Sequence, residues 1–313
     1  MADTMKAVRI HEFGGPEVLR YEDTLKPEPG EGQILVKVAA AGVNPIDWKI
    51  RTGSLEVMMP HTLPLILGWD AAGIVEAAGA GVINFKPGDE VYAVAGMAGN
   101  GCYAEYVLAD AAALALKPKT TDFVTAAAIP VTALTAWQAL FDLGKLVPGQ
   151  TVLIHGAGGA VGSAAVQFAK NAGATVVATA SGADLDYVRE IGADTVVDYK
   201  TRKFEEAARD VDFVLDTVGG ETGIRSFTTM KAGGMLVATA APPDAEAAAK
   251  AGVRAEMINA RPNAAQLREI GDRIDGGTFK VRIGLTLPLS EAKQAQEKGQ
   301  AGQVKGKIVL SVP

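Results

Sequence analysis

The sequence predicts an α/β protein in which a β-rich domain, a partly open barrel, is joined to a doubly wound parallel sheet of strand order 3-2-1-4-5-6. Three observations carry this prediction. Short strands separated by Gly/Pro turns fill the first third of the chain; a strand, a glycine cluster and a helix follow one another over residues 151–170; strands then alternate with helical stretches. Since 313 residues exceed the usual single core, we expect two domains.

Composition excludes several classes of protein. The net charge of -6 gives no electrostatic reason to expect nucleic acid or an anionic membrane as partner. Cys102 is the only cysteine, so an internal disulfide framework is impossible and a reducing compartment is the simpler reading. The N-terminus lacks the apolar core of a secretory signal, and the uncharged run at 125–141 is too short for a membrane span. We expect a cytoplasmic protein with a buried helix over that run.

The β-rich domain is predicted from regularly spaced strands that end near Pro118. Its turns are Gly/Pro clusters such as Gly14-Gly15-Pro16 and Lys86-Pro87-Gly88-Asp89. The expected strands are residues 5–10, 34–40, 73–78, 90–93 and 104–108.

The glycine cluster after the strand at 151–154 predicts a dinucleotide-binding turn. Read from Ala157, the residues follow the pattern G-x-G-x-x-G with alanine in the first place. Gly159 would let the backbone approach a pyrophosphate, Gly162 would let the helix lie close to the strand, and the helix N-terminus would supply amide donors. The cofactor-binding residues expected here are Ala157, Gly158, Gly159, Ala160, Val161 and Gly162.

Further strands predict a complete nucleotide-binding domain. They are expected at residues 175–179, 195–197, 211–215, 235–239 and 253–257, with a loop and a short helix over 240–250. Ligands of such sheets bind beyond the carboxyl ends of the strands. The cofactor-binding residues predicted there are Ser181, Tyr199, Thr217, Val218, Thr239 and Ala240.

The last segment is too short to form a third core. A helix at 264–274, a strand at 279–283, a helix from Ser290 and a strand at 307–312 are expected to return to the first domain. The predicted domains are therefore residues 1–121 with 261–313, and residues 122–260.

Seven motifs, in order along nearly the whole chain, carry a family resemblance. They are AAGVNPIDWKIRTG (40–53), LPLILGWDAAGIV (63–75), FKPGDEVYA (85–93), YAEYV (103–107), LTAWQAL (134–140), IHGAGGAVG (154–162) and VKGKIVL (304–310). The chain resembles the zinc-independent quinone oxidoreductase branch of the medium-chain dehydrogenase/reductase superfamily. The resemblance implies a GroES-like catalytic domain, a Rossmann domain and a homodimer.

The sequence departs from the zinc-dependent alcohol dehydrogenases of the same superfamily at the metal ligands. Their catalytic zinc needs a cysteine where Gly42-Val43-Asn44 stands and a histidine in a Gly-His-Glu triplet, which here reads Gly68-Trp69-Asp70. Trp69 cannot coordinate a metal, and the four-cysteine structural lobe is missing. We expect no metal site.

Without a Lewis acid, a conjugated acceptor is the expected substrate, because hydride addition to its β-carbon leaves a delocalised enolate. The resemblance places Asn44 beside the nicotinamide as donor to the substrate oxygen, Thr135 near the nicotinamide ribose or carboxamide, and Trp69 on the substrate side. Met97 and Met257 offer an adaptable apolar pocket wall. Asn44 as a plain turn residue before Pro45, and Thr135 bonded to its own helix, are the alternatives. No proton donor is identified.

The expected cofactor is NADPH, with NADH as the other option. The end of the second strand, residues 179–182, has no carboxylate to hold a ribose 2′-hydroxyl. Ser181 and, by resemblance, Tyr199 could bind a 2′-phosphate. NADPH-dependent relatives usually carry a cation where Asp184 stands, so the preference should be weaker here.

The expected activity is therefore NADPH-dependent reduction of quinones or α,β-unsaturated carbonyl compounds. The expected partner is a small-molecule quinone or enone, with no nucleic acid and no membrane. The alternative is a nucleotide-binding protein of the same fold without enzymatic activity, of the lens structural or RNA-binding kind.

Overall fold

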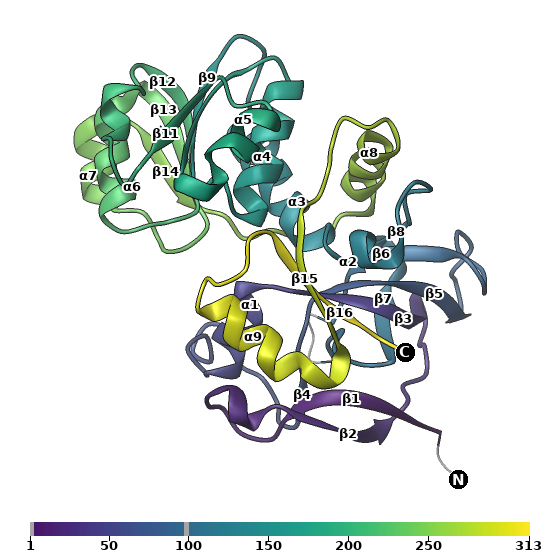
Figure 1. Cartoon of the computed structure of the whole chain (residues 1–313). Helices are drawn as coiled ribbons and strands as arrows, with labels where there is room; N and C mark the ends of the chain where they lie inside the picture. The colour runs from purple at the N-terminus through teal and green to yellow at the C-terminus, as the bar shows by residue number, and fades with distance from the viewer. Residues whose placement is uncertain (1–2, 97–99) are drawn as a thin grey trace. The chain divides into compact units, whose positions relative to one another are not determined.

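A computed structural model describes residues 3–96 and 100–313 (Figure 1). The chain divides into two compact units. The N-terminal unit comprises residues up to Val131 together with Pro262–Gly277 and Val281–Pro313, and the central unit comprises Thr132–Arg261 with Thr278–Lys280.

Two sheets build the N-terminal unit. The larger has the order β15-β16-β3-β5-β6-β8, with β7 also paired to β3; the smaller has the order β2-β1-β4. β3 is the longest strand in the described part of the chain. Its core residues Ile34, Val36 and Val38 alternate, and after a register irregularity between Val38 and Ala40 the alternation resumes with Ala41 and Val43. The strands from the first part of the chain are β1 (Thr4–Ile10), β2 (Arg20–Leu25), β3 (Gln33–Val43), β4 (Leu65–Ile66), β5 (Asp70–Ala78), β6 (Glu90–Val94), β7 (Tyr106–Asp110) and β8 (Leu114–Leu116).

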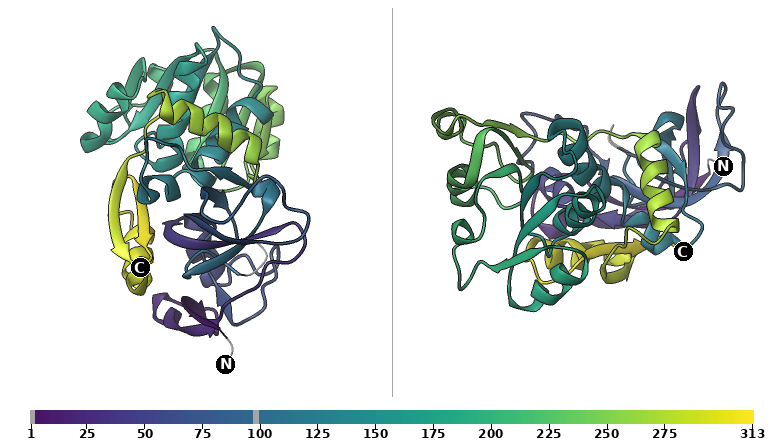
Figure 2. Two further views of the ribbon diagram at one scale, coloured as in Figure 1. Left: turned by 90° about the vertical axis from the view of Figure 1, so that its right-hand side faces the viewer. Right: turned by 90° about the horizontal axis from the view of Figure 1, so that it is seen from above.

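The C-terminal segment completes the N-terminal unit. It contains α8 (Ala264–Asp275), β15 (Ile283–Pro288), α9 (Ala292–Gln300) and β16 (Lys307–Ser311). Figure 2 shows β15, α9 and β16 in yellow beside the early strands, where β16 pairs antiparallel with β3 and Ile308 lies opposite Val43.

The strand expected at residues 279–283 was wrongly placed, since β15 begins only at Ile283. The apolar side chain that suggested it, Phe279, belongs to the core of the central unit. Its ring centroid lies 4.6 Å from that of Phe168, and the backbone of Lys280 exchanges two hydrogen bonds with Gln167.

The central unit is a six-stranded parallel sheet of order β11-β10-β9-β12-β13-β14, which confirms the predicted order 3-2-1-4-5-6. Its strands are β9 (Thr151–His155), β10 (Thr175–Ala180), β11 (Thr195–Asp198), β12 (Val211–Asp216), β13 (Met230–Ala238) and β14 (Arg254–Met257). Helices α4 (Ala160–Asn171) and α5 (Leu185–Glu190) cover one face, and α6 (Glu221–Ser226) and α7 (Ala245–Ala251) the other (Figure 1).

The uncharged run at 125–141 is helical but interrupted. It forms parts of α2 (Phe123–Ala127), α3 (Pro130–Trp137) and a π-helical segment, Gln138–Leu143. Pro130 has no N–H to continue α2 and instead begins α3. A further short helix, α1 (Pro45–Arg51), follows β3. In the part of the chain that the structure describes, no helix is long and apolar enough to cross a membrane.

Candidate functional site

The connection from β9 to α4, residues 156–162, forms the predicted glycine turn. Gly156 has a φ of +67°, and a methyl group on it would lie 2.3 Å from Thr217 Oγ1. The sharp bend therefore falls on Gly156, one residue before the position that the pattern gave to Ala157, whose side chain is fully buried.

Gly162 and Gly159 have different spatial constraints. A Cβ on Gly162 would lie 2.4 Å from the carbonyl oxygen of Gly156, so the start of α4 packs directly on the turn. A Cβ on Gly159 would meet only that carbonyl, at 3.3 Å, and would otherwise point into open space. Gly159 is also the N-cap of the twelve-residue helix α4, with Ala160 and Val161 in its half-buried first turn. This bare backbone at a helix N-terminus fits a dinucleotide pyrophosphate.

The other predicted cofactor residues of this unit follow the carboxyl ends of its parallel strands. Thr217 Oγ1 donates to the carbonyl of His155, 2.8 Å away, which ties the end of β12 to that of β9. The backbone N–H of Tyr199 donates to Ala180, and that of Thr239 donates to Asp216. These predicted residues follow the two strands on each side of β9 and so lie at the same edge of the sheet as the glycine turn. They are Ser181, Tyr199, Thr217, Val218, Thr239 and Ala240.

Two buried polar side chains outside the predicted set of cofactor residues, Asp216 and His155, shape this edge. Asp216 Oδ1 accepts from the N–H groups of Val218 and Gly219, both at 2.9 Å, and so fixes the loop after β12. His155 contacts Thr179 Oγ1 and Ser226 Oγ, and burial lowers its pKa to about 4. A histidine with that pKa stays neutral near pH 7, so it acts here as part of the fold.

The region where the adenosine end of a cofactor is expected carries both signs of charge. Asp184 is buried, and a methyl group on Gly158 would lie 2.8 Å from its Oδ2, so its carboxylate packs against the glycine turn. Tyr199 is 57% exposed, and the exposed basic residues Lys200, Arg202 and Lys203 follow it. The sequence interpretation overlooked this basic run, although its position directly after a strand end was a signal.

A second group of functional candidates lies inside the N-terminal unit. Asn44 Nδ2 donates to Asp70 Oδ2 at 2.8 Å, and Lys307 Nζ donates both to Asp70 Oδ2, at 2.9 Å, and to Asn44 Oδ1. All three residues are at most 3% exposed. Asp70 Oδ1 in turn accepts from the N–H of Val131.

Asp47 and Tyr103 extend this group. Asp47 Oδ2 accepts from the backbone N–H of Asn44 at 2.8 Å and from the Tyr103 hydroxyl at 2.7 Å. Within the described residues its Oδ1 is buried and has no hydrogen-bond partner. Burial, the largest effect, raises the pKa of Asp47 to about 7, and the nearby Asp70 adds to the rise. Asn44, Asp47, Asp70, Tyr103 and Lys307 are called the buried polar cluster below.

Lys307 was missed as a site residue because it opens an apolar strand in the motif VKGKIVL and looks like a solvated flank. It is 237 positions from Asp70, and only the pairing of β16 with β3 and of β3 with β5 brings them together. A lone lysine directly followed by four strand residues was the only available signal.

The remaining predicted site residues are distributed over both units. Trp69 is half-buried and packs against the core of the N-terminal unit. Thr135 is buried on α3 of the central unit, and Met257 ends β14 with 44% of its surface exposed. Met97 lies outside the described residues. The structure therefore groups Asn44 with charged partners and groups the cofactor residues at one sheet edge.

Metal-binding side chains do not gather in residues 3–96 and 100–313, where no three or more His, Cys, Asp or Glu residues could hold an ion together. Cys102 is buried, and burial raises the pKa of its thiol well above the usual value.

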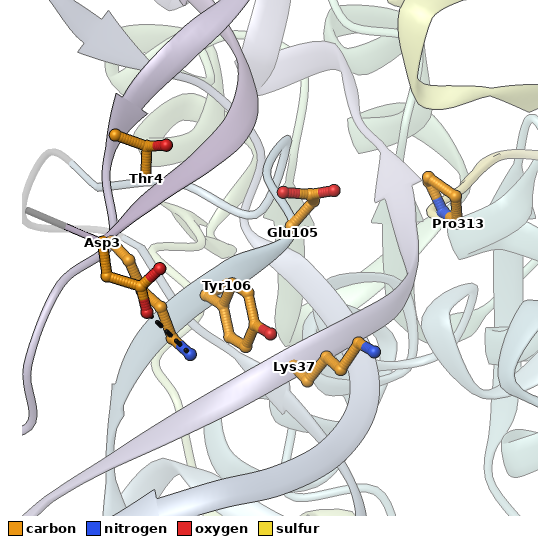
Figure 3. A pocket seen from close by; sticks show the side chains of 7 residues that line it. Asp3, Thr4, Lys37, Glu105, Tyr106 and Pro313 are labelled. Atoms are coloured by element: carbon orange, nitrogen blue, oxygen red, sulfur yellow. Dashed lines mark ion pairs between the residues drawn. The ribbon is translucent and has the colours of Figure 1, made fainter. Parts of the chain in front are cut away.

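A hollow of about 200 Å³ opens elsewhere on the N-terminal unit (Figure 3). Asp3, Thr4, Lys37, Glu105, Tyr106 and Pro313 line it together with Lys26. The Lys26 ammonium lies 3.9 Å from the Tyr106 ring centroid and 3.1 Å from Glu76, so the positive charge of Lys26 is already paired within the protein.

Known protein families match two regions of the chain. Residues 30–119 match the family described as "Alcohol dehydrogenase GroES-like domain", and residues 191–310 match the family described as "Zinc-binding dehydrogenase". The quinone oxidoreductase of Coxiella burnetii is 36% identical, with a TM-score of 0.92 over 99% of this chain and 100% of that chain.

Two further similar proteins are described with different cofactors. The NADPH-dependent alkenal/one oxidoreductase of Arabidopsis thaliana, a chloroplastic protein, is 33% identical over 98% of this chain and 79% of its own length. A structure described as an NAD-dependent alcohol dehydrogenase is 32% identical, with a TM-score of 0.89, 99% of this chain and 100% of that chain being covered.

Proposed function

The chain belongs to the quinone oxidoreductase branch of the medium-chain dehydrogenase/reductase superfamily, and we propose that it reduces quinones or α,β-unsaturated carbonyl compounds with NADPH. A bound nicotinamide would supply the hydride. The protein's contribution is to hold the cofactor, orient the acceptor and stabilise the enolate oxygen that develops on the substrate.

The observation that carries the proposal is the combination of a bare glycine turn with a buried asparagine in a charged cluster. The turn exposes backbone N–H groups and no side chain at Gly159, which suits a pyrophosphate. Asn44 Nδ2 has two hydrogens, and one of them is directed to Asp70. The other is the donor that we assign to the carbonyl oxygen of the substrate.

A conjugated acceptor suits this site better than a saturated ketone. Addition of hydride to the β-carbon of an enone moves charge to an oxygen that one amide donor can stabilise, and water can protonate the enolate afterwards. Trp69 stands where the resemblance places a zinc-ligating histidine in the alcohol dehydrogenases, and an indole is no metal ligand. We therefore propose that the reaction proceeds without zinc.

NADPH is the proposed cofactor because positive charge follows β11. Lys200, Arg202 and Lys203 are exposed after Tyr199, although Arg202 is paired with Glu206 at 3.2 Å, and no carboxylate stands at residues 179–182. The NADPH dependence of the Arabidopsis relative supports this choice, whereas the NAD dependence of the similar alcohol dehydrogenase and the buried Asp184 oppose a strong preference.

The proposal is tested with the pure protein, NADPH or NADH, and a panel of acceptors. The panel holds quinones, enones and enals, each paired with the saturated ketone or aldehyde of the same skeleton. We expect oxidation of NADPH with the conjugated members only, at a rate unchanged by a chelator.

Other outcomes would overturn the proposal. Efficient reduction of the saturated partners would replace conjugate addition by direct carbonyl reduction. Tight binding of NADPH without turnover of any acceptor would favour a nucleotide-binding protein without enzymatic activity.

A further inference from the structure

We propose that Lys307 is a positioning residue that fixes and polarises the side-chain amide of Asn44. The inference rests on the proposed role of Asn44 in the reaction. Lys307 Nζ donates to Asn44 Oδ1 and, at 2.9 Å, to Asp70 Oδ2, while Asn44 Nδ2 donates to that same carboxylate oxygen at 2.8 Å. The three polar groups thus form a closed triangle inside the N-terminal unit.

This triangle determines which end of the amide is the oxygen. An ammonium group has donors only, so the atom of Asn44 that faces Lys307 must be Oδ1. The ion-paired carboxylate of Asp70 has acceptors only, so the atom that faces it must be Nδ2. A 180° flip of the amide would set donor against donor and acceptor against acceptor.

The orientation leaves one Nδ2 hydrogen with a fixed direction. A donor that stabilises charge in the transition state must already be oriented, because reorientation during the reaction would cost what the hydrogen bond gains. The ammonium on Oδ1 also draws electron density from the amide, which makes its remaining N–H a stronger donor.

The fold delivers these groups by strand register. Ile308 of β16 lies opposite Val43 of β3, so Lys307 and Asn44 are adjacent across the pair. Asp70 begins β5 opposite Gly42, and a Cβ on Gly42 would lie 2.8 Å from Asp70 Oδ2. The absence of a side chain at Gly42 therefore lets the carboxylate reach Asn44.

The test is a double-mutant cycle on one enone that the parent protein reduces. Lys307→Met, Asn44→Ala and the double variant are compared in kcat, KM for the enone and dissociation constant for NADPH. Lys307→Met should lower kcat about ten- to a hundredfold while both binding constants stay within about threefold. The double variant should be no slower than Asn44→Ala alone to within about twofold, because Lys307 acts through Asn44.

Two further variants serve as controls. Lys307→Arg keeps a donor and should recover most of the lost turnover. Lys37→Met removes an exposed lysine from β3 and should change nothing. If Lys307→Met fails to fold because Asp70 loses its ion pair, Asp70→Asn/Lys307→Gln replaces it, since that pair is neutral and retains amide donors.

A second measurement does not depend on activity. In ¹⁵N NMR spectra, the side-chain amide hydrogens of Asn44 should exchange with solvent at least about tenfold faster in the Lys307 variant than in the parent, because the triangle is opened. Unchanged exchange would overturn the inference even if no substrate were found.

The outcomes separate the inference from the proposed function. If Asn44→Ala slows turnover but Lys307→Met does not, or if the two effects multiply in the double variant, Lys307 does not position Asn44. If Asn44→Ala itself keeps the parent kcat, both the role of Asn44 and the inference built on it are wrong.

Discussion

The glycine turn and the buried polar cluster prepare two parts of the proposed reaction by opposite means. The turn uses backbone groups within residues 156–162, and its specificity lies in side chains that are missing. The cluster uses side chains from Asn44 to Lys307, and the three side chains of Asn44, Asp70 and Lys307 are at most 3% exposed. Cofactor binding at the turn therefore depends on space next to the backbone, whereas the orientation of the Asn44 amide depends on side chains that lie far apart in the sequence.

The two regions also differ in what stabilises them. The hydrogen bonds of the turn are made by its backbone, such as Gly159 N–H to the carbonyl of Gly156 and Ala157 N–H to that of Thr179. The ion pair of Lys307 and Asp70 is buried, and removal of one partner of such a pair typically costs about 3–5 kcal/mol. Substitutions should therefore damage the turn by added volume and the cluster by uncompensated charge.

The largest effects are expected from valine substitutions in the turn, which separate binding from folding. Gly159→Val should reduce the affinity for NADPH by more than about a hundredfold and leave the melting temperature within about 2 °C of the parent, because its Cβ would approach only one atom, the carbonyl oxygen of Gly156 at 3.3 Å. Gly162→Val should unfold the central unit, because its Cβ would lie 2.4 Å from a backbone oxygen. Cofactor titration and circular dichroism measure the two quantities.

A Gly159→Ala variant is the matched control, with a smaller loss of affinity. Cofactor affinity within twofold of the parent in Gly159→Val would show that the pyrophosphate does not pass over this residue. A well-folded Gly162→Val variant would contradict the tight packing of α4 on the turn.

The contrast between the regions explains what the sequence could predict. The glycine spacing and the alternation of strands and helices are local signals, and they led to the turn and to the correct sheet order. The triangle of Asn44, Asp70 and Lys307 depends on the register of β16, β3 and β5, which no local pattern encodes. Phe279 misled for the same reason, since its apolar side chain packs on Phe168 and belongs to no strand.

The next effect concerns the pH dependence of stability in the buried polar cluster. Asp47 has a pKa of about 7 in the folded protein against 3.8 for the ordinary side chain, so the folded state holds the proton more tightly. This carboxyl therefore lowers the free energy of unfolding as pH rises from about 4 to 7, by a few kcal/mol as an order of magnitude. Asp47→Asn should match the parent near pH 4 and become more stable than the parent by a growing margin up to about pH 7.

Melting temperatures of both proteins between pH 4 and 8 test this sign. Only the difference between variant and parent is informative, because other carboxylates titrate in both proteins. One of them is Asp194, whose pKa is lowered by its hydrogen bond with Lys170. A constant difference across the range would show that Asp47 stays ionised in the cluster.

The smallest effect is expected on cofactor affinity at the edge of the turn, where the buried side chain of Asp184 lies. Its carboxylate packs against Gly158, close to where the adenosine end of the cofactor is expected. Asp184→Asn keeps the shape and removes the charge, so the affinity for NADPH should rise about tenfold at low salt while that for NADH changes less than about twofold.

Ser181→Asp is the opposite control, because a new carboxylate at the end of β10 should repel a 2′-phosphate and favour NADH. Fluorescence titrations at two salt concentrations give both affinities, and the gain in Asp184→Asn should shrink at high salt. An unchanged ratio of the two affinities in Asp184→Asn would show that this carboxylate serves only the packing of the turn and leaves the choice of cofactor to Ser181, Tyr199 and the basic residues after β11.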